Sequence, residues 1–165
     1  MSANWDGAKA KAREIREKYA VNKPPINAFD IANGEGINIV YFTPNDATKD
    51  ISGLLDKNNK KIYLNSRESA ARQNYTLAHE LAHLFLDHKA NEYGVYRRDS
   101  LYSEQKPEKE QEADYFAAEL LMPKELVDEV KTRYSLTNND VTALSKLFGV
   151  SPSAMKFRLK NLQRG

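Results

Sequence analysis

The spacing of apolar residues near the start of the chain is typical of an amphipathic helix. Apolar side chains recur there at steps of three and four residues, namely at Trp5, Ala8, Ala12, Ile15 and Tyr19. Steps of that length place them on one face of a helix over residues 5–19. Pro24 and Pro25 interrupt the pattern, and Asn27 can then cap a short helix that ends near Gly34.

The next part of the chain has the pattern of β-strands. Residues 37–42 (INIVYF) are rich in β-branched and aromatic side chains, and residues 51–55 and 61–65 are two further short strand-like segments. Residues 56–60 (DKNNK), which separate the last two, have the composition of a hairpin turn. The sequence therefore predicts a small antiparallel sheet.

The second half of the chain predicts helices. They are expected over residues 68–88, 104–121 and 123–133, from Asn138 or Asn139 to a C-terminal cap at Gly149, and over residues 152–162. Residues 89–103 show no regular period and are expected to form a surface loop. We therefore predict an α+β fold in which the sheet packs on the 68–88 helix. Residues 1–136 would form the core and 137–165 a helical pair packed on it, or the whole chain would be one domain.

The candidate chemistry lies in the helix over residues 68–88, which contains the sequence HELAH at positions 79–83. Residues four apart lie on one helical face, so His79 and His83 can bind one metal ion while the helix stays intact. Glu80 then lies beside the ion, where it can take a proton from a bound water molecule. Zinc suits this kind of ligand. The flanking residues are apolar and predict a buried helix, in which unpaired polar side chains would be costly.

A catalytic zinc site needs a third protein ligand. His88 lies about two and a half helical turns after His79, on the opposite side of a continuous helix, so we expect it to be a solvated residue at the helix end. The position ten residues after His79, where some families have a third histidine, is Lys89. A carboxylate from the next helix is the remaining choice, and periodicity leaves Glu108, Glu110 and Glu112 open.

Two blocks of sequence, in this order and with this separation, closely resemble the ImmA/IrrE family of metallopeptidases. They are residues 72–84 (RQNYTLAHELAHL) and residues 112–123 (EADYFAAELLMP), and a looser likeness extends over most of the chain. Asp114 and Ala82 stand where the family commonly has Asn and Gly. Neither change removes a ligand, but either could alter the hydrogen bonds that orient the ligands.

This resemblance implies a zinc endopeptidase in which Glu80 is the catalytic base. The glutamate that opens the second block, Glu112, is implied to be the third zinc ligand beside His79 and His83. The resemblance also implies a protein substrate, a helix-turn-helix transcriptional repressor that is cleaved to relieve repression in bacteria or their mobile elements. The group that stabilises the oxyanion stays open among loop residues, namely Tyr93, Tyr96, Arg97, Arg98 and Tyr102.

Composition limits the alternatives. The chain has 165 residues, 41% of them hydrophobic, which is enough for a packed core. The net charge of +2 does not favour a general nucleic-acid or membrane-surface binder. The chain has no cysteine, which excludes disulfides, thiolate ligands and a cysteine nucleophile. No segment is long and apolar enough to span a bilayer, and the N-terminus does not have the pattern of a signal peptide, so we expect a cytoplasmic protein without a membrane partner.

The predicted C-terminal helical pair resembles a helix-turn-helix and is locally basic. Residues 137–165 carry five Lys or Arg residues against Asp140, a local charge of +4. A basic second helix could contact phosphate, but a helical hairpin packed on the core is the simpler interpretation, and DNA binding is not favoured. Two alternatives to the peptidase therefore stay open: a DNA-binding regulator with a structural or sensory metal site, and a toxin–antitoxin component. The intact Glu80 favours the peptidase.

Overall fold

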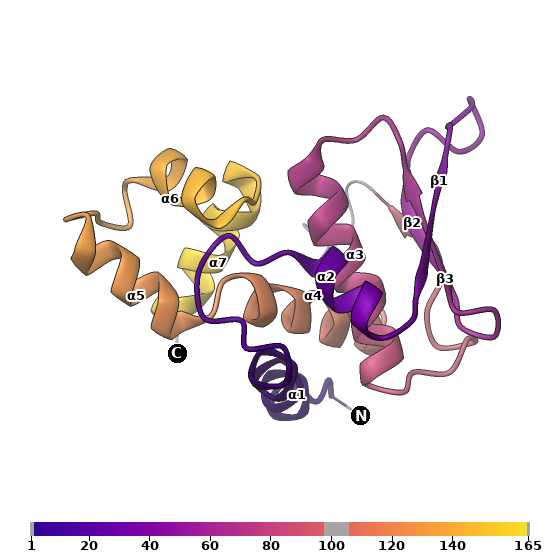
Figure 1. Ribbon diagram of the computed structural model, residues 1–165, viewed down its shortest axis with the longest axis horizontal. Coiled ribbons are helices and arrows are strands. Elements are labelled where there is room, and N and C mark those ends of the chain that lie inside the picture. Colours follow the sequence, from indigo (N-terminus) through magenta and orange to yellow (C-terminus); the bar gives the residue numbers. More distant parts are fainter. Residues whose placement is uncertain (1, 98–105, 165) are drawn as a thin grey trace.

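The computed structural model describes residues 2–97 and 106–164. In this part of the chain the elements follow the order α1 (Trp5–Lys18), α2 (Ala28–Gly34), β1 (Asn38–Phe42), β2 (Ile51–Asp56), β3 (Lys61–Asn65), α3 (Ala70–Phe85), β4 (Tyr96–Arg97), α4 (Glu108–Leu121), α5 (Lys124–Arg133), α6 (Val141–Phe148) and α7 (Pro152–Arg164). The predicted α+β fold is confirmed. The sheet stands at one end of the molecule, α5, α6 and α7 at the other, and α3 and α4 lie between them (Figure 1).

The sheet is mixed, which corrects the expectation of a purely antiparallel sheet. Its strand order is β1-β3-β2-β4. The hairpin of β2 and β3 is antiparallel as predicted, with Leu55 opposite Ile62. However, β3 lies between β1 and β2 and pairs with β1 in parallel, with Ile39 opposite Ile62. The antiparallel edge strand β4 falls within the segment that was expected to be a loop without regular structure.

Helix α3 occupies the centre of the fold, where other elements pack around its second half. Ser69 caps its N-terminus, where the hydroxyl accepts a hydrogen bond from the amide of Arg72 at 3.2 Å. From Tyr75 to His83 every residue of the helix is buried. The sheet covers one side of α3 through β2 and β3, and α2 and α4 pack on its other sides. The polar side chains between Tyr75 and His83, which include His79 and Glu80, are therefore held away from bulk water.

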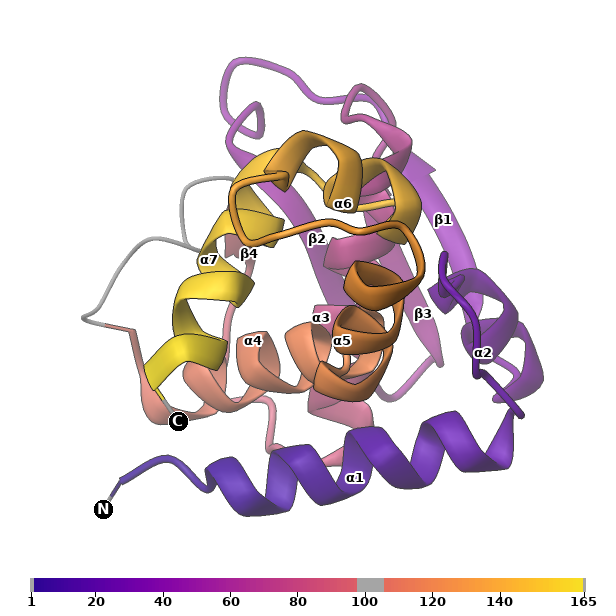
Figure 2. The ribbon, with the colours of Figure 1, turned by 90° about the vertical axis from the view of Figure 1, so that its left-hand side faces the viewer.

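The predicted C-terminal helices are present and pack on the rest of the chain. α6 begins after Asp140, one or two residues later than expected, because the Asp140 carboxylate accepts a hydrogen bond from the amide of Thr137 and organises that turn. Gly149 ends α6 in the left-handed conformation, with φ of 65°. Buried apolar residues from α1 to α7 belong to one cluster. In Figure 2, α1 runs along the edge of the molecule below the C-terminal helices.

One basic residue of α7 is turned into this core. The guanidinium of Arg158 is 2% exposed and forms an ion pair with Glu119 of α4 at 3.0 Å. Its Nε also donates a hydrogen bond to the carbonyl of Met122 at 2.9 Å. Arg158 is thus unavailable to a phosphate, whereas Lys156 and Lys160 on the same helix are exposed. None of the described helices is both long and apolar enough to cross a membrane.

Candidate metal centre

The two histidines of the HExxH motif lie one turn apart on α3, and their rings converge. The Nε2 atoms of His79 and His83 are 3.3 Å apart, and both side chains are fully buried. Two ligands of a tetrahedral zinc ion with bonds of about 2.0–2.1 Å have donor atoms about 3.3 Å apart. The spacing of the two ring nitrogens therefore fits such an ion.

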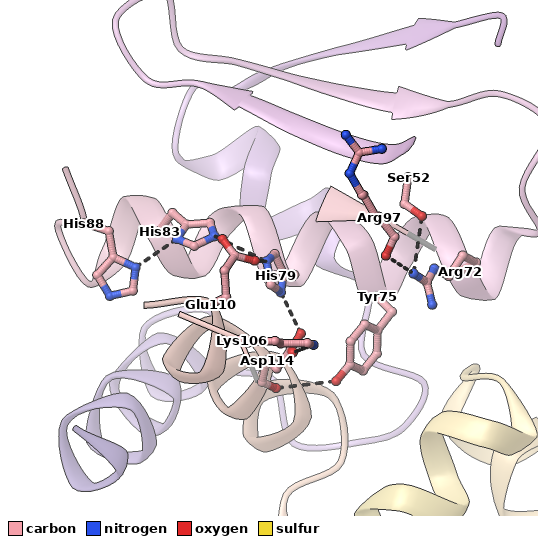
Figure 3. A network of polar contacts seen from close by, with 10 residues as sticks. All are labelled: Ser52, Arg72, Tyr75, His79, His83, His88, Arg97, Lys106, Glu110 and Asp114. Atoms are coloured by element: carbon pink, nitrogen blue, oxygen red, sulfur yellow. Dashed lines mark hydrogen bonds and ion pairs between the residues drawn. The ribbon is translucent and has the colours of Figure 1, made fainter. Parts of the chain in front are cut away.

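A carboxylate from α4 completes the group. Glu110 places one carboxylate oxygen 3.0 Å from Nε2 of His79 and the other 3.1 Å from Nε2 of His83 (Figure 3). Among the described residues, these three side chains form a group whose possible ligand atoms all lie within 4.8 Å of one another. Two imidazoles and one carboxylate are the donor set of many catalytic zinc sites.

Glu112, the ligand that the family resemblance implies, lies outside this group. One of its carboxylate oxygens contacts Nε2 of His88 at 2.8 Å, and the other accepts a hydrogen bond from the backbone amide of Asn4 at 2.9 Å. Residues two apart on a helix point about 200° away from each other, so Glu110 and Glu112 cannot both face α3. The structure thus brings Glu110, and not Glu112, to the two histidines.

Asp114 orients the first histidine. Its Oδ1 lies 2.8 Å from Nδ1 of His79, and Lys106 forms an ion pair with its other oxygen. The carboxylate accepts a hydrogen bond from the N–H at Nδ1, so Nε2 is the ring nitrogen that faces Glu110 and would bind a metal ion. Asp114 stands where the family commonly has Asn, and here it supplies the hydrogen bond that fixes the ring.

His88 is the third histidine, and the expectation that it is solvated is wrong. Its side chain is only 1% exposed, and its Nδ1 lies 2.8 Å from Nδ1 of His83. The continuous helix assumed from the sequence ends at Phe85, and Asp87 takes a left-handed conformation with φ of 54°. This turn brings His88 back alongside α3, where its amide donates to the carbonyl of His83 at 3.0 Å.

Glu80 is buried next to this group without a polar partner. Its side chain is fully buried, and neither carboxylate oxygen has a hydrogen-bond partner among the residues that the structure describes. Burial raises the pKa of Glu80 to about 8, against the opposing charge of His79. A buried carboxylate with a raised pKa is suited to accept and return a proton near neutral pH.

The electrostatics of the three converging side chains favour a positive charge between them. Burial opposes ionisation of Glu110, but the neighbouring rings of His79 and His83 hold the pKa of its carboxyl group far below the usual range. Burial lowers the pKa of His83 to about 4, which keeps its ring neutral. Burial also favours a neutral His79, but the neighbouring Asp114 and Glu110 outweigh it and raise the pKa of His79 to about 10. The carboxylates of Glu110 and Asp114 thus favour positive charge at His79, and a metal ion bound at Nε2 would take the place of the proton there.

The segment before β4 and β4 itself cover the two histidines. The ring of Tyr93 stacks on His83 at 4.0 Å, and the ring of Tyr96 stacks on His79 at 3.8 Å. Arg97 is exposed, and its backbone carbonyl accepts a hydrogen bond from Arg72. Of the five residues considered for the oxyanion, Arg98 and Tyr102 lie outside the described residues. Of the described candidates, Tyr93 and Tyr96 lie closest to the metal-binding group, because their rings stack on the two imidazoles.

A buried helix with an HExxH motif, completed by a glutamate from a following helix, defines the class of metallopeptidase-like metal centres. The model of the IrrE N-terminal-like domain, a peptidase family, matches residues 32–160. The chain therefore belongs to the ImmA/IrrE family of metallopeptidases.

Individual relatives agree with this membership. The chain is 29% identical over 157 residues to the radiation response metalloprotease IrrE of Deinococcus deserti, which covers 92% of this chain and 53% of the relative. It is 31% identical to the uncharacterized immunity region protein 2 of Bacillus phage phi105, over 83% of this chain and 81% of that protein. It is 27% identical to the metallopeptidase ImmA of Bacillus subtilis, over 74% of this chain and 68% of that protein. The chain thus spans about half the length of the Deinococcus relative.

A solved structure shares the fold. A transcriptional regulator of Mycobacterium tuberculosis superposes with a TM-score of 0.62 at 12% sequence identity, over 91% of this chain and 45% of that one. At this level of identity the likeness concerns the arrangement of helices and strands.

Proposed function

We propose that this chain is a zinc-dependent endopeptidase whose metal ion is held by His79, His83 and Glu110. The observation that carries the proposal is the convergence of these three buried side chains, with all contacts between 3.0 and 3.3 Å. Glu110 replaces Glu112 in the ligand set because of this geometry. Zinc is favoured because the donors are two imidazoles and one carboxylate, with no thiolate in the chain.

The residues around the metal position each have a chemical role in this proposal. When bound, zinc supplies an acidified water molecule and a Lewis acid for the peptide carbonyl. Glu80 accepts the proton of the attacking water at a carboxylate oxygen and returns it to the nitrogen of the leaving amine. Asp114 holds the ring of His79 in the required tautomer. Tyr93 and Tyr96 keep bulk water away from the imidazoles, so a peptide must displace part of this cover to reach Glu80.

The substrate that we propose is a helix-turn-helix transcriptional repressor, cleaved within the cytoplasm to relieve repression. Support for the substrate comes from the family resemblance and from the relatives, one of which is described as an immunity region protein and another as a radiation response metalloprotease. Residues 1–136 would carry the peptidase site and residues 137–165 would pack on it. The alternative of a DNA-binding regulator is weakened by Arg158, since this basic residue of α7 is buried in an ion pair.

The test first asks whether the reading frame next to this one encodes a helix-turn-helix repressor, and then incubates that repressor with the purified chain and zinc. We expect a single cleavage, seen as two fragments by mass spectrometry, which a chelator abolishes. Glu80→Gln keeps the size of the side chain but cannot accept the proton, so it should bind zinc and cleave at least about 100-fold more slowly. Equal cleavage by the wild type and Glu80→Gln would overturn the peptidase proposal.

A second measurement tests the ligand set. Zinc content after dialysis should be close to one ion per chain in the wild type and close to zero in His83→Ala and Glu110→Ala, because each loses a ligand. Glu112→Ala should still take up one ion when zinc is in excess. If Glu112→Ala lost the ion and Glu110→Ala kept it, the assignment of Glu110 would be wrong while the peptidase proposal would stand.

A further inference from the structure

We infer that His88 and Glu112 position the imidazole of His83 for metal binding, through a chain of hydrogen bonds that ends at the start of α1. This inference rests on the proposed role of His83 as a metal ligand. The chain runs from Nδ1 of His83 to Nδ1 of His88 at 2.8 Å, and from Nε2 of His88 to the carboxylate of Glu112 at 2.8 Å. The first of these contacts is drawn in Figure 3, beside the His79–Glu110 group.

The direction of each hydrogen bond follows from the groups that take part. A carboxylate accepts hydrogen bonds, and Glu112 already accepts one from the backbone amide of Asn4 at 2.9 Å. Its second oxygen therefore accepts the proton on Nε2 of His88. A neutral His88 then has a lone pair at Nδ1, which accepts the proton on Nδ1 of His83. His83 is left with its lone pair at Nε2, the atom that lies 3.1 Å from Glu110.

The opposite arrangement would prevent metal binding. If His88 donated from Nδ1 to His83, a neutral His83 would carry its proton on Nε2 and could not bind a metal ion there. Nδ1 of His88 thus accepts the hydrogen bond from Nδ1–H of His83, as the Asp114 carboxylate accepts the one from Nδ1–H of His79 at 2.8 Å. Partners of this kind fix the tautomer and the angle of a ligand ring, and their loss weakens metal binding by about 10- to 100-fold.

The backbone holds this chain of contacts in place. The amide of His88 donates to the carbonyl of His83 at 3.0 Å, and the amide of Asp87 donates to the carbonyl of Leu84 at 3.3 Å. These are the two bonds that close a helix around a left-handed residue, here Asp87. The backbone and the ring of His88 are therefore both tied to the same residue, His83, and the ring is 1% exposed.

The two ring nitrogens of His88 can be tested separately. Asparagine carries an amide oxygen near the position of Nδ1, so His88→Asn keeps the acceptor for His83. Glutamine carries an amide nitrogen near the position of Nε2, so His88→Gln keeps the donor to Glu112 but not the acceptor. His88→Leu fills much of the same volume without either contact. Glu112→Ala removes the end of the chain of contacts, and Glu14→Ala, at an exposed carboxylate on α1, is the matched control.

The readout is the dissociation constant for zinc, measured by competition with a chromogenic chelator in the absence of any substrate. We expect His88→Leu and His88→Gln to bind zinc about 10- to 100-fold more weakly than the wild type. His88→Asn should recover most of this loss. Glu112→Ala should be weakened in the same direction, and Glu14→Ala should match the wild type. Circular dichroism and thermal unfolding of the metal-free proteins show whether each variant is folded.

Two results would overturn the inference: wild-type zinc affinity in a folded His88→Leu, or equal weakening in His88→Asn and His88→Gln. The second result would mean that the ring acts only by filling space. If His88→Leu does not fold, the zinc dissociation constants of His88→Asn and His88→Gln decide between the two interpretations. His83→Ala separates this inference from the proposed function. Normal zinc binding by His83→Ala would mean that the proposed ligand set is wrong. If His83→Ala loses zinc while the His88 variants and Glu112→Ala bind it normally, the ligand set stands and the positioning role of His88 is wrong.

Discussion

Replacement of Arg158 by methionine should destabilise the protein strongly, although the residue is far along the chain from the metal centre. The guanidinium is 2% exposed and its partner Glu119 is 5% exposed, so both charges are buried. Breaking one partner of a buried pair leaves the other charge uncompensated, at a cost of about 3–5 kcal/mol. The carbonyl of Met122 also loses its hydrogen bond from Nε of Arg158. We expect a total near the upper end of that range, about 4–5 kcal/mol, because both losses are buried.

The assay is urea unfolding followed by circular dichroism, together with the thermal midpoint. For a domain of this size, about 4–5 kcal/mol corresponds to a fall in the midpoint of roughly 8–20 °C. The double variant Arg158→Met with Glu119→Gln removes both charges and should regain a large part of the loss. Lys156→Met, an exposed position on the same helix, should stay within about 0.5 kcal/mol of the wild type.

The result also bears on the C-terminal helical pair. A loss below about 1 kcal/mol in Arg158→Met would refute the reasoning, because an exposed pair contributes no more than that. It would mean that the Arg158 side chain is exposed in solution and able to bind a phosphate. The DNA-binding alternative would then be better supported. A large loss with a single cooperative transition would show instead that residues 137–165 fold together with the core, as one unit.

Three further predictions follow from local geometry. Gly53→Ala should cost about 1–3 kcal/mol in denaturant unfolding, because the added Cβ would lie 2.5 Å from Cγ2 of Thr76; an unchanged midpoint would contradict this. Gly149→Ala should cost about 1–2 kcal/mol in the same assay, because φ is +65° there and left-handed backbone disfavours a Cβ. Tyr93→Ala should release zinc to a chelator faster than the wild type, because the ring that covers His83 at 4.0 Å is removed; equal release rates would mean that the stacked ring does not limit exit of the metal.

The helices and most strands could be predicted because their signals are local. The caps at Asn27 and Gly149 and the apolar stripe of α1 each act within a few residues, and the structure has all three. The pairing of β1 with β3 could not be predicted, because apolar patterning marks a strand but not its neighbour. β4 is two residues long, too short to show any pattern.

The sequence contains a feature that distinguishes Glu110 from Glu112, namely the four-residue spacing of Glu110 and Asp114. The periodicity of apolar residues does not make use of it. Residues four apart share a helical face, about 40° from each other, so Glu110 and Asp114 face α3 together. Once Asp114 is recognised as the partner of His79, Glu110 is the carboxylate on the same face of α4 and Glu112 is not. The resemblance to the family pointed to this segment of α4, and the helical angle distinguishes the carboxylate that faces the two histidines from the one that does not.

The position of His88 shows why a residue near a ligand can be misjudged from sequence. A helix that continued through residue 88 would turn His88 away from His79, and no glycine or proline between His83 and His88 marks an earlier end. Asp87 takes the left-handed position that glycine usually fills, with φ of 54°, which the short polar side chain of aspartate tolerates better than most. The turn places His88 beside His83 and within reach of Glu112 on α4. Glu112 was expected to bind the metal directly; in the structure its contact with this part of the site passes through His88.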